Sequence, residues 1–187
     1  MPKITEQLTV EEVAAVVSDA LENAGITAIL SGGSAVTIYS HNQYLSRDLD
    51  FVTSAMVADL KPVLEHLGFE HTGVPKLSQF SHPKVEWYVE FPPSPLTFGH
   101  LHVNPTDCDV IELPVGKLRI ITPTQSVMDR LAAVYAWNDV QSRDQAILVA
   151  VNQDIDWEVL ELWFADEGVS DEEFRRFRES VRARKHG

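Results

Sequence analysis

The sequence predicts an α/β (α+β) fold in which a small mixed sheet is flanked by helices and followed by a C-terminal helical segment. Short apolar runs, typical of buried strands, occur between Thr27 and Ile121 and are separated by glycines and prolines. Helical periodicity precedes the first of these runs and dominates the chain after Thr122. We therefore expect an α/β core at residues 1–121 and a helical segment at residues 122–187 packed on it.

The first predicted helix has clear start and stop signals. Thr9 and Glu12 have the spacing of a capping box, in which each side chain accepts a hydrogen bond from the other residue's backbone N–H. An apolar stripe at helical spacing follows, and Gly25 ends it. Residues 27–30 then predict a short buried strand. Two glycines interrupt that strand, and a short helix is expected at residues 34–39.

Residues 48–52 alternate polar and apolar side chains, which is the period of a half-buried strand. The remaining elements of the α/β part are expected as a helix capped by Ser54 and ended by Gly68, strands between 69 and 91 with 85–91 the strongest, and a hairpin of strands 109–113 and 117–121. The prolines of residues 92–95 must leave the sheet, because proline cannot donate to a strand ladder.

The helical segment begins at a strong signal, with Thr122 as N-cap and proline in the first helical position. Helices are predicted at about 124–137, 141–152, 156–167 and 171–185. Trp137, Trp157 and Trp163 recur among their apolar positions, and core packing explains them more simply than base stacking does.

Composition and charge limit the classes of function. The net charge is −13, and phosphate neutralisation by Lys and Arg supplies most nonspecific nucleic-acid binding, so such binding is disfavoured. Six of the fifteen cations nevertheless lie in the last thirteen residues, which leaves a nucleic-acid partner uncertain. No apolar run is long enough to span a bilayer, no signal peptide is recognised, and Cys108 is the single cysteine. We expect a cytoplasmic protein with no membrane partner.

The segment that carries chemistry combines Gly32, Gly33 and Ser34 with Asp48 and Asp50. Side chains two residues apart on a strand project from the same face, so the two aspartates place their carboxylates side by side. Such a pair repels itself unless a cation lies between the charges, and hard oxygen ligands suit Mg²⁺, with Mn²⁺ as an alternative. Two glycines before a helix allow the backbone to approach a ligand, and the helix N-terminus favours a phosphate.

These motifs, in this order and spacing, resemble the signature of the minimal nucleotidyltransferase superfamily. The resemblance is greatest to the branch related to abortive-infection and toxin–antitoxin nucleotidyltransferases. It covers roughly residues 28 to 150 and rests on the segments 30–36, 46–52, 89–96, 129–133 and 137–139. It implies a nucleotidyltransferase fold.

The resemblance also implies further site residues. A third carboxylate of the family stands on a neighbouring strand, and Glu90 matches it better than Glu86, although the family usually has Asp there. A cation that contacts the nucleotide corresponds to Arg130, which can equally pair with acidic neighbours on the helices. Arg47 either contacts a phosphate or offsets the local negative charge.

The activity implied is transfer of a nucleoside monophosphate from an NTP to an unidentified acceptor, which can be an RNA end, a protein hydroxyl or a small molecule. Asp48, Asp50 and Glu90 would hold the metal, and the phosphates would lie on the glycine turn. A toxin–antitoxin role with a cognate antitoxin-like partner fits the same branch. Two alternatives are a catalytically inactive binding module of the same fold and a metal-dependent phosphohydrolase.

His100 and His102 lie two residues apart, a spacing that zinc sites use. The sequence offers no third ligand at a recognisable spacing, so we do not expect zinc there.

Overall fold

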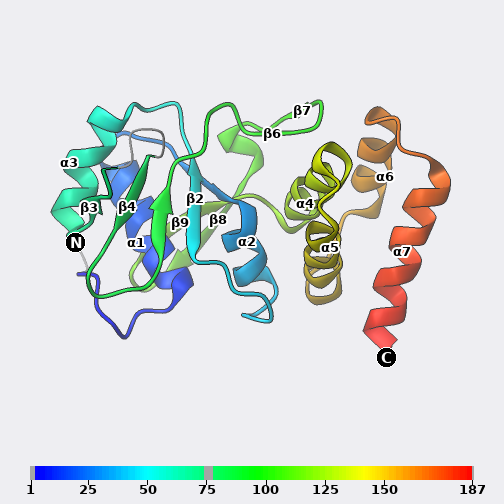
Figure 1. The fold of residues 1–187 in the computed structure, drawn as a ribbon, viewed down its shortest axis with the longest axis horizontal. Coiled ribbons are helices and arrows are strands. Elements are labelled where there is room, and N and C mark those ends of the chain that lie inside the picture. The colour runs from blue at the N-terminus through cyan, green and yellow to red at the C-terminus, as the bar shows by residue number, and fades with distance from the viewer. Residues whose placement is uncertain (1–2, 74–77, 187) are drawn as a thin grey trace.

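In the computed structural model, which describes residues 3–73 and 78–186, a seven-stranded mixed sheet lies on one side of the molecule and four consecutive helices lie on the other (Figure 1). The strand order of the sheet is β3-β4-β5-β2-β1-β9-β8. The structure confirms the predicted class of a mixed α/β fold.

The strands of the large sheet are short, and a separate hairpin consists of β6 and β7. The bounds of the strands are β1 Ile29–Ser31, β2 Asp48–Val52, β3 Glu70–His71, β4 Gln79–Ser81, β5 Tyr88–Glu90, β6 Thr97–Phe98, β7 Leu101–His102, β8 Asp109–Leu113 and β9 Gly116–Ile120. A single 3-10 turn, η1, covers Pro105–Asp107 within the described chain.

The helices fall into two groups. The first three, interspersed among the strands, are α1 Val10–Asn23, α2 Gly32–Tyr39 and α3 Val57–Leu67. The last four follow one another and are α4 Pro123–Trp137, α5 Val140–Asn152, α6 Trp157–Asp166 and α7 Asp171–His186. The predicted capping box at the start of α1 is present, and Thr122 caps α4 as expected, with Gln125 completing a second box.

The centre of the sheet determines where the site lies. Strand β1 pairs antiparallel with β2 and parallel with β9, and β2 pairs parallel with β5. Leu30, Leu49 and Val89, one from each of three adjacent strands, are completely buried. Because side chains alternate along a strand, burial of Leu49 and Phe51 turns the intervening polar residues to the opposite face.

Helix α2 lies between the sheet and the pair α4–α5, and therefore connects the two parts of the molecule (Figure 1). The Tyr39 hydroxyl at its end donates to the Ile121 carbonyl at 2.6 Å. The Gln153 side chain donates to the Tyr39 carbonyl at 2.8 Å. These contacts attach the helical segment to the end of the central strands.

Three predictions about local structure are wrong. The N-cap of α3 is Met56 rather than Ser54, so the helix begins later than expected. Strand β5 begins at Tyr88 instead of Val85, which leaves Glu86 exposed in a bend outside the sheet. Trp137 does not pack in the core, because 82% of its surface is exposed at the end of α4.

None of the described helices has the length and apolar character required to cross a membrane.

Candidate nucleotide and metal site

The strand register brings the proposed carboxylates onto neighbouring positions. In the parallel pair of β2 and β5, Asp48 lies opposite Tyr88 and Asp50 lies opposite Glu90. All three acidic residues are partly buried, whereas the residues between them point into the core. The sheet thus places Asp48, Asp50 and Glu90 on one face, as the sequence alternation predicts for the first two.

The turn after β1 touches one of these carboxylates directly. Gly32 has a φ of +64°, and a Cβ atom at this position would lie 2.3 Å from Asp50 Oδ2. Any L-residue here would therefore be both strained and in collision with the carboxylate. Since α2 begins at Gly32, its N-terminal backbone amides lie next to Asp50.

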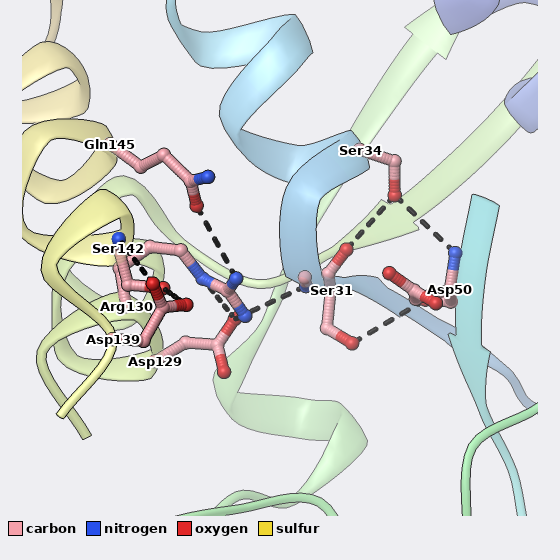
Figure 2. A network of polar contacts seen from close by, with 9 residues as sticks. Ser31, Ser34, Asp50, Asp129, Arg130, Asp139, Ser142 and Gln145 are labelled. Carbon is pink, nitrogen blue, oxygen red and sulfur yellow. Dashed lines mark hydrogen bonds and ion pairs between the residues drawn. The ribbon is translucent and has the colours of Figure 1, made fainter. Parts of the chain in front are cut away.

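Gly33 and Ser34 fix the relative positions of the helix and the strand. A Cβ atom on Gly33 would lie 3.0 Å from Ser46 Oγ, so this position is also tight. The Ser34 hydroxyl is buried, donates to the Ser31 carbonyl at 2.9 Å and accepts from the Asp50 backbone N–H at 3.4 Å (Figure 2). In this structure the hydroxyl is therefore committed to backbone contacts between α2 and β2.

Asp50 is the electrostatic centre of the site. Burial, together with the charges of Glu90 and Asp48, raises the pKa of its carboxyl from the usual 3.8 to about 7. The Arg130 guanidinium opposes this rise. The shift reflects three acids that share a poorly solvated region, and a divalent cation bound to these oxygens would relieve the repulsion.

Glu90 has a side-chain partner of its own on the sheet. Its carboxylate accepts a short hydrogen bond from the Gln79 side chain of the neighbouring strand β4. Within residues 3–73 and 78–186, the one set of three ligating side chains whose donor atoms all lie within 4.8 Å of one another is found elsewhere. The donor chemistry of Asp48, Asp50 and Glu90 fits Mg²⁺ or Mn²⁺, and the Gln79 contact occupies one of the two Glu90 oxygens that could serve such an ion.

Arg130 and its neighbour Asp129 approach the same turn from α4. Asp129 Oδ2 accepts the Gly32 N–H at 3.2 Å and pairs with Arg130 Nη2 at 2.8 Å (Figure 2). The guanidinium also donates to Gln145 on α5 at 3.4 Å. Arg130 thus lies close to the helix N-terminus, and it is engaged by its neighbouring acid.

The remaining predicted residue, Arg47, lies apart from this network. Its side chain is exposed in the bend before β2, and its carbonyl accepts the Tyr88 N–H at 2.9 Å. The backbone of Arg47 therefore supports the strand pair, while its guanidinium extends toward solvent.

Three hollows surround these groups. The central one, of about 330 Å³, contains Ser31, Asp50, Asp129 and Arg130 among its walls. A second, of about 600 Å³, shares Thr97, Asp129 and Arg130 with it and extends along α4. A third, of about 720 Å³, shares Pro92 and Pro93 with the central one and includes Glu90. We call the first the central hollow, the second, along α4, the helical hollow, and the third, with Glu90, the sheet hollow.

The compact set of three ligating side chains comprises His100, Asp166 and Glu167, of which Glu167 lines the helical hollow. Glu167 accepts the His100 backbone N–H at 2.6 Å, and the His100 ring lies 3.4 Å from the same carboxylate. His102, the expected partner of His100, does not belong to the set. The contact attaches the β6–β7 hairpin to the end of α6.

Sequence reasoning did not identify Asp129 and Gln79 as part of the site. Asp129 contacts Gly32, 97 residues away in the chain, and Gln79 contacts Glu90 across a strand pair. The motif at residues 129–133 belongs to the stated resemblance and pointed to this region, but it assigned a role to the arginine alone. No local pattern distinguishes Gln79 from any other polar residue on a strand.

Comparison with known proteins identifies a structural likeness and no sequence relative. No family model matches the chain, and no curated protein matches it. Among solved structures, the lincosamide antibiotic adenylyltransferase LnuA with lincomycin bound is similar at a TM-score of 0.52 and 16% sequence identity. The likeness covers 78% of this chain and 99% of that one. It confirms the nucleotidyltransferase fold expected from the sequence.

Proposed function

We propose that the chain is a divalent-metal-dependent nucleotidyltransferase that moves a nucleoside monophosphate from an NTP to a hydroxyl group. The observation that carries the proposal is the register that sets Asp50 beside Glu90, directly against the glycine turn at the start of α2. This arrangement places acidic metal ligands next to backbone amides that favour phosphate. The structural likeness to an adenylyltransferase supports the same activity.

Each group has a chemical task in this proposal. Asp48, Asp50 and Glu90 would hold Mg²⁺ or Mn²⁺, which when bound neutralises charge on the triphosphate and polarises the phosphorus under attack. The acceptor oxygen bonds to the α-phosphorus, the bond from that phosphorus to the bridging oxygen breaks, and pyrophosphate leaves with the electron pair. The proton of the acceptor hydroxyl passes to the Glu90 carboxylate and then to solvent. Arg130 and the Gly32 amide offset phosphate charge, with Gly33 and Ser34 holding the turn in place.

The acceptor is proposed to enter through the sheet hollow, because this hollow includes Glu90. Its described walls are formed mainly by small, apolar and proline side chains, and none of them is positively charged. A nucleic-acid acceptor needs phosphate neutralisation, so the hollow fits an RNA end poorly. Its volume of about 720 Å³ lies in the range of small-molecule sites. We therefore favour a small hydroxyl-bearing molecule, in keeping with the lincomycin held by the similar structure.

The sequence leaves a toxin–antitoxin role, a protein hydroxyl acceptor and an antitoxin-like partner open, and these expectations rest on the resemblance alone. We also propose that the α/β part at 1–121 and the helical segment at 122–187 form opposite walls of one nucleotide site. Asp50 on β2 and Arg130 on α4 line the same central hollow, which supports that division.

One observation favours the alternative of an inactive binding module. Gln79 donates to one Glu90 oxygen, and the donor atoms of Asp48, Asp50 and Glu90 do not all lie within 4.8 Å of one another. If this hydrogen bond persists when nucleotide and metal are present, Glu90 has one oxygen fewer for the metal and for the acceptor proton.

Product analysis separates the three possibilities. Each NTP is incubated with Mg²⁺, the chain and a panel of hydroxyl-bearing small molecules that includes lincomycin, and the products are identified by mass spectrometry and phosphate assays. We expect pyrophosphate together with a nucleotidylated acceptor. Release of orthophosphate without an adduct would identify a phosphohydrolase. Absence of both products, with NTP still bound, would identify a binding module, and either outcome contradicts the proposal.

A further inference from the structure

An exposed tryptophan marks the outer end of the helical hollow. Trp137 lines this hollow, yet 82% of its surface is exposed, whereas Trp163, which lines it from α6, is 5% exposed. Leaving so large an aromatic side chain in water forgoes stabilisation that burial would supply. Exposed aromatic side chains at the mouth of a cavity are suited to contact a ligand that covers them.

The walls of the hollow leave a slot beside α4. The part of α4 that borders it carries three alanines between Arg130 and Trp137, with Tyr135 among them, and the other walls come from the β6–β7 hairpin and the end of α6. The residues with the smallest side chains in this lining are Gly99, Ala132, Ala133 and Ala136. A flat ring can therefore approach the helix backbone closely and still reach Trp137 at the end of the same helix.

The hollow adjoins the candidate phosphate site. The helical and central hollows share Thr97, Asp129 and Arg130, and the central hollow contains Asp50. Arg130 and Trp137 are seven residues apart on α4, which corresponds to two turns and a rise of about 10 Å. The two adjoining hollows thus have a cation at their shared wall and an aromatic ring at the outer end of the helical one.

We propose that the helical hollow is the nucleoside subsite of the NTP, with the base stacked on Trp137 and its sugar and phosphates extending past Arg130 toward Asp50. This inference rests on the proposed function, because it assumes that the central hollow receives phosphates. The acceptor then occupies the sheet hollow on the other side of the carboxylates.

The polar wall of the hollow predicts a preference among bases. The Glu167 carboxylate lines it, is 13% exposed as a side chain, and is contacted by His100 alone among the hydrogen bonds and ion pairs of the described residues. A carboxylate offers about four acceptor positions, so capacity remains for donors from a ligand. Adenine, guanine and cytosine present an exocyclic amino group and uracil does not. ATP, GTP and CTP should therefore bind more tightly than UTP.

The test uses intrinsic fluorescence and a probe without a nucleoside. Mg²⁺ with ATP, UTP or inorganic tripolyphosphate is titrated into the wild type, Trp137→Phe, Trp137→Ala and the control Trp157→Phe. Trp157 packs against Phe174 and Phe177 and does not line the hollow. We expect ATP to quench the emission of the wild type and of Trp157→Phe more strongly than that of Trp137→Phe, in which Trp163 is the remaining tryptophan of the hollow. Trp137→Ala should bind ATP about tenfold more weakly and tripolyphosphate equally well.

The possible failures are distinguishable. If Trp137→Ala binds ATP as tightly as the wild type, or loses ATP and tripolyphosphate affinity equally, the base does not stack on Trp137 and the inference fails while the proposed function stands. Equal affinity for UTP and ATP contradicts the assignment of Glu167. If neither ATP nor tripolyphosphate binds the folded wild type, the proposed function fails together with the inference. Thermal unfolding of each variant confirms that this exposed position has not altered the fold.

Discussion

Asp50 of the sheet and Arg130 of the helical segment face the same central hollow, but different kinds of contact hold them there. Asp50 lies on a strand paired on both sides, its backbone N–H donates to the Ser34 hydroxyl, and its carbonyl accepts from the Ser31 hydroxyl. Arg130 is held by its neighbour Asp129 and by one amide on α5. The metal side of the site is therefore fixed by the sheet, whereas the phosphate side depends on a few side-chain contacts that a ligand can exchange.

The largest expected effect on activity comes from substitution of Gly32, which contacts Asp50 on the sheet side of the site. Gly32→Ala introduces a Cβ atom 2.3 Å from Asp50 Oδ2 at a φ of +64°, so both the turn and the carboxylate must move. Because displacement of a reacting group by about 1 Å can cost about 100-fold in rate, we expect nucleotide transfer to fall by at least that factor.

Gly25→Ala is the matched control, since its φ of +78° imposes similar strain and nothing lies within 4 Å of the new atom. It should lose about 1 kcal/mol of stability and retain activity. Equal losses of activity in both variants would show that backbone strain, and not contact with the carboxylate, explains the requirement for Gly32.

The next effect tests the side-chain contacts of the helical side. Arg130→Gln leaves Asp129 without its ion-pair partner at a position where both side chains are less than one-fifth exposed, at 18% and 17%. We expect a loss of about 2 kcal/mol in the free energy of unfolding, measured by urea denaturation, together with weaker NTP binding. Arg176→Gln breaks an exposed pair on α7 and should cost less than about 0.5 kcal/mol. A similar loss of unfolding free energy in the two variants would show that the Arg130–Asp129 pair stabilises the fold no more than an exposed pair does.

A third prediction concerns the repulsion among the acids of the sheet. The pKa of Asp50 is raised to about 7 in the folded chain, against 3.8 ordinarily, so the folded state retains a proton that the unfolded state releases. The protonated Asp50 carboxyl therefore contributes to the free energy of unfolding in full below about pH 4, and this contribution is lost as pH rises through 7. In metal-free buffer at pH 8, Asp50→Asn should be more stable than wild type by about 1–2 kcal/mol.

Mg²⁺ should stabilise the wild type at pH 8 and leave Asp50→Asn almost unchanged, because the ion requires the charge that asparagine lacks. Asp154→Asn, at an exposed position, is the control for a general change in net charge. If stability of the wild type rises between pH 5 and pH 8 in metal-free buffer, the carboxylates do not repel one another as the structure indicates.

The smallest expected effect concerns Gln79. Its hydrogen bond to Glu90 competes with metal binding in the proposed site, so Gln79→Ala should strengthen Mn²⁺ binding by about threefold. Mn²⁺ binding is measured by electron paramagnetic resonance in the presence of ATP. Weaker Mn²⁺ binding in the variant would show instead that Gln79 orients Glu90 for the ion.

The same contrast explains what could be predicted from the sequence. Alternation along 48–52 indicated a strand with two carboxylates on one face, because the period of a strand is a local property. The capping boxes at Thr9 and Thr122 were likewise readable from a few adjacent residues. The fold class followed from these elements and from the motif resemblance.

The features that escaped prediction depend on distant contacts. The approach of Asp129 to Gly32 requires α4 to dock beside α2, which no local pattern encodes. Trp137 occupies a position consistent with core packing in the sequence, but it lies at the end of α4 beyond the neighbours that bury Trp163. The strand at 85–91 is shorter than expected because pairing is limited to Tyr88–Glu90. All three residues pair with β2, and Val89 and Glu90 also pair with β4.

The central claim is that Asp48 and Asp50, with Glu90, form a metal-dependent NTP site. The most direct measurement is calorimetric titration of each NTP, with Mg²⁺ and with EDTA, into the wild type and into Asp48→Asn/Asp50→Asn. The account predicts binding that requires Mg²⁺ and disappears in a double variant that remains folded. Binding of equal strength in the double variant, or no binding of any NTP to the folded wild type, would contradict it.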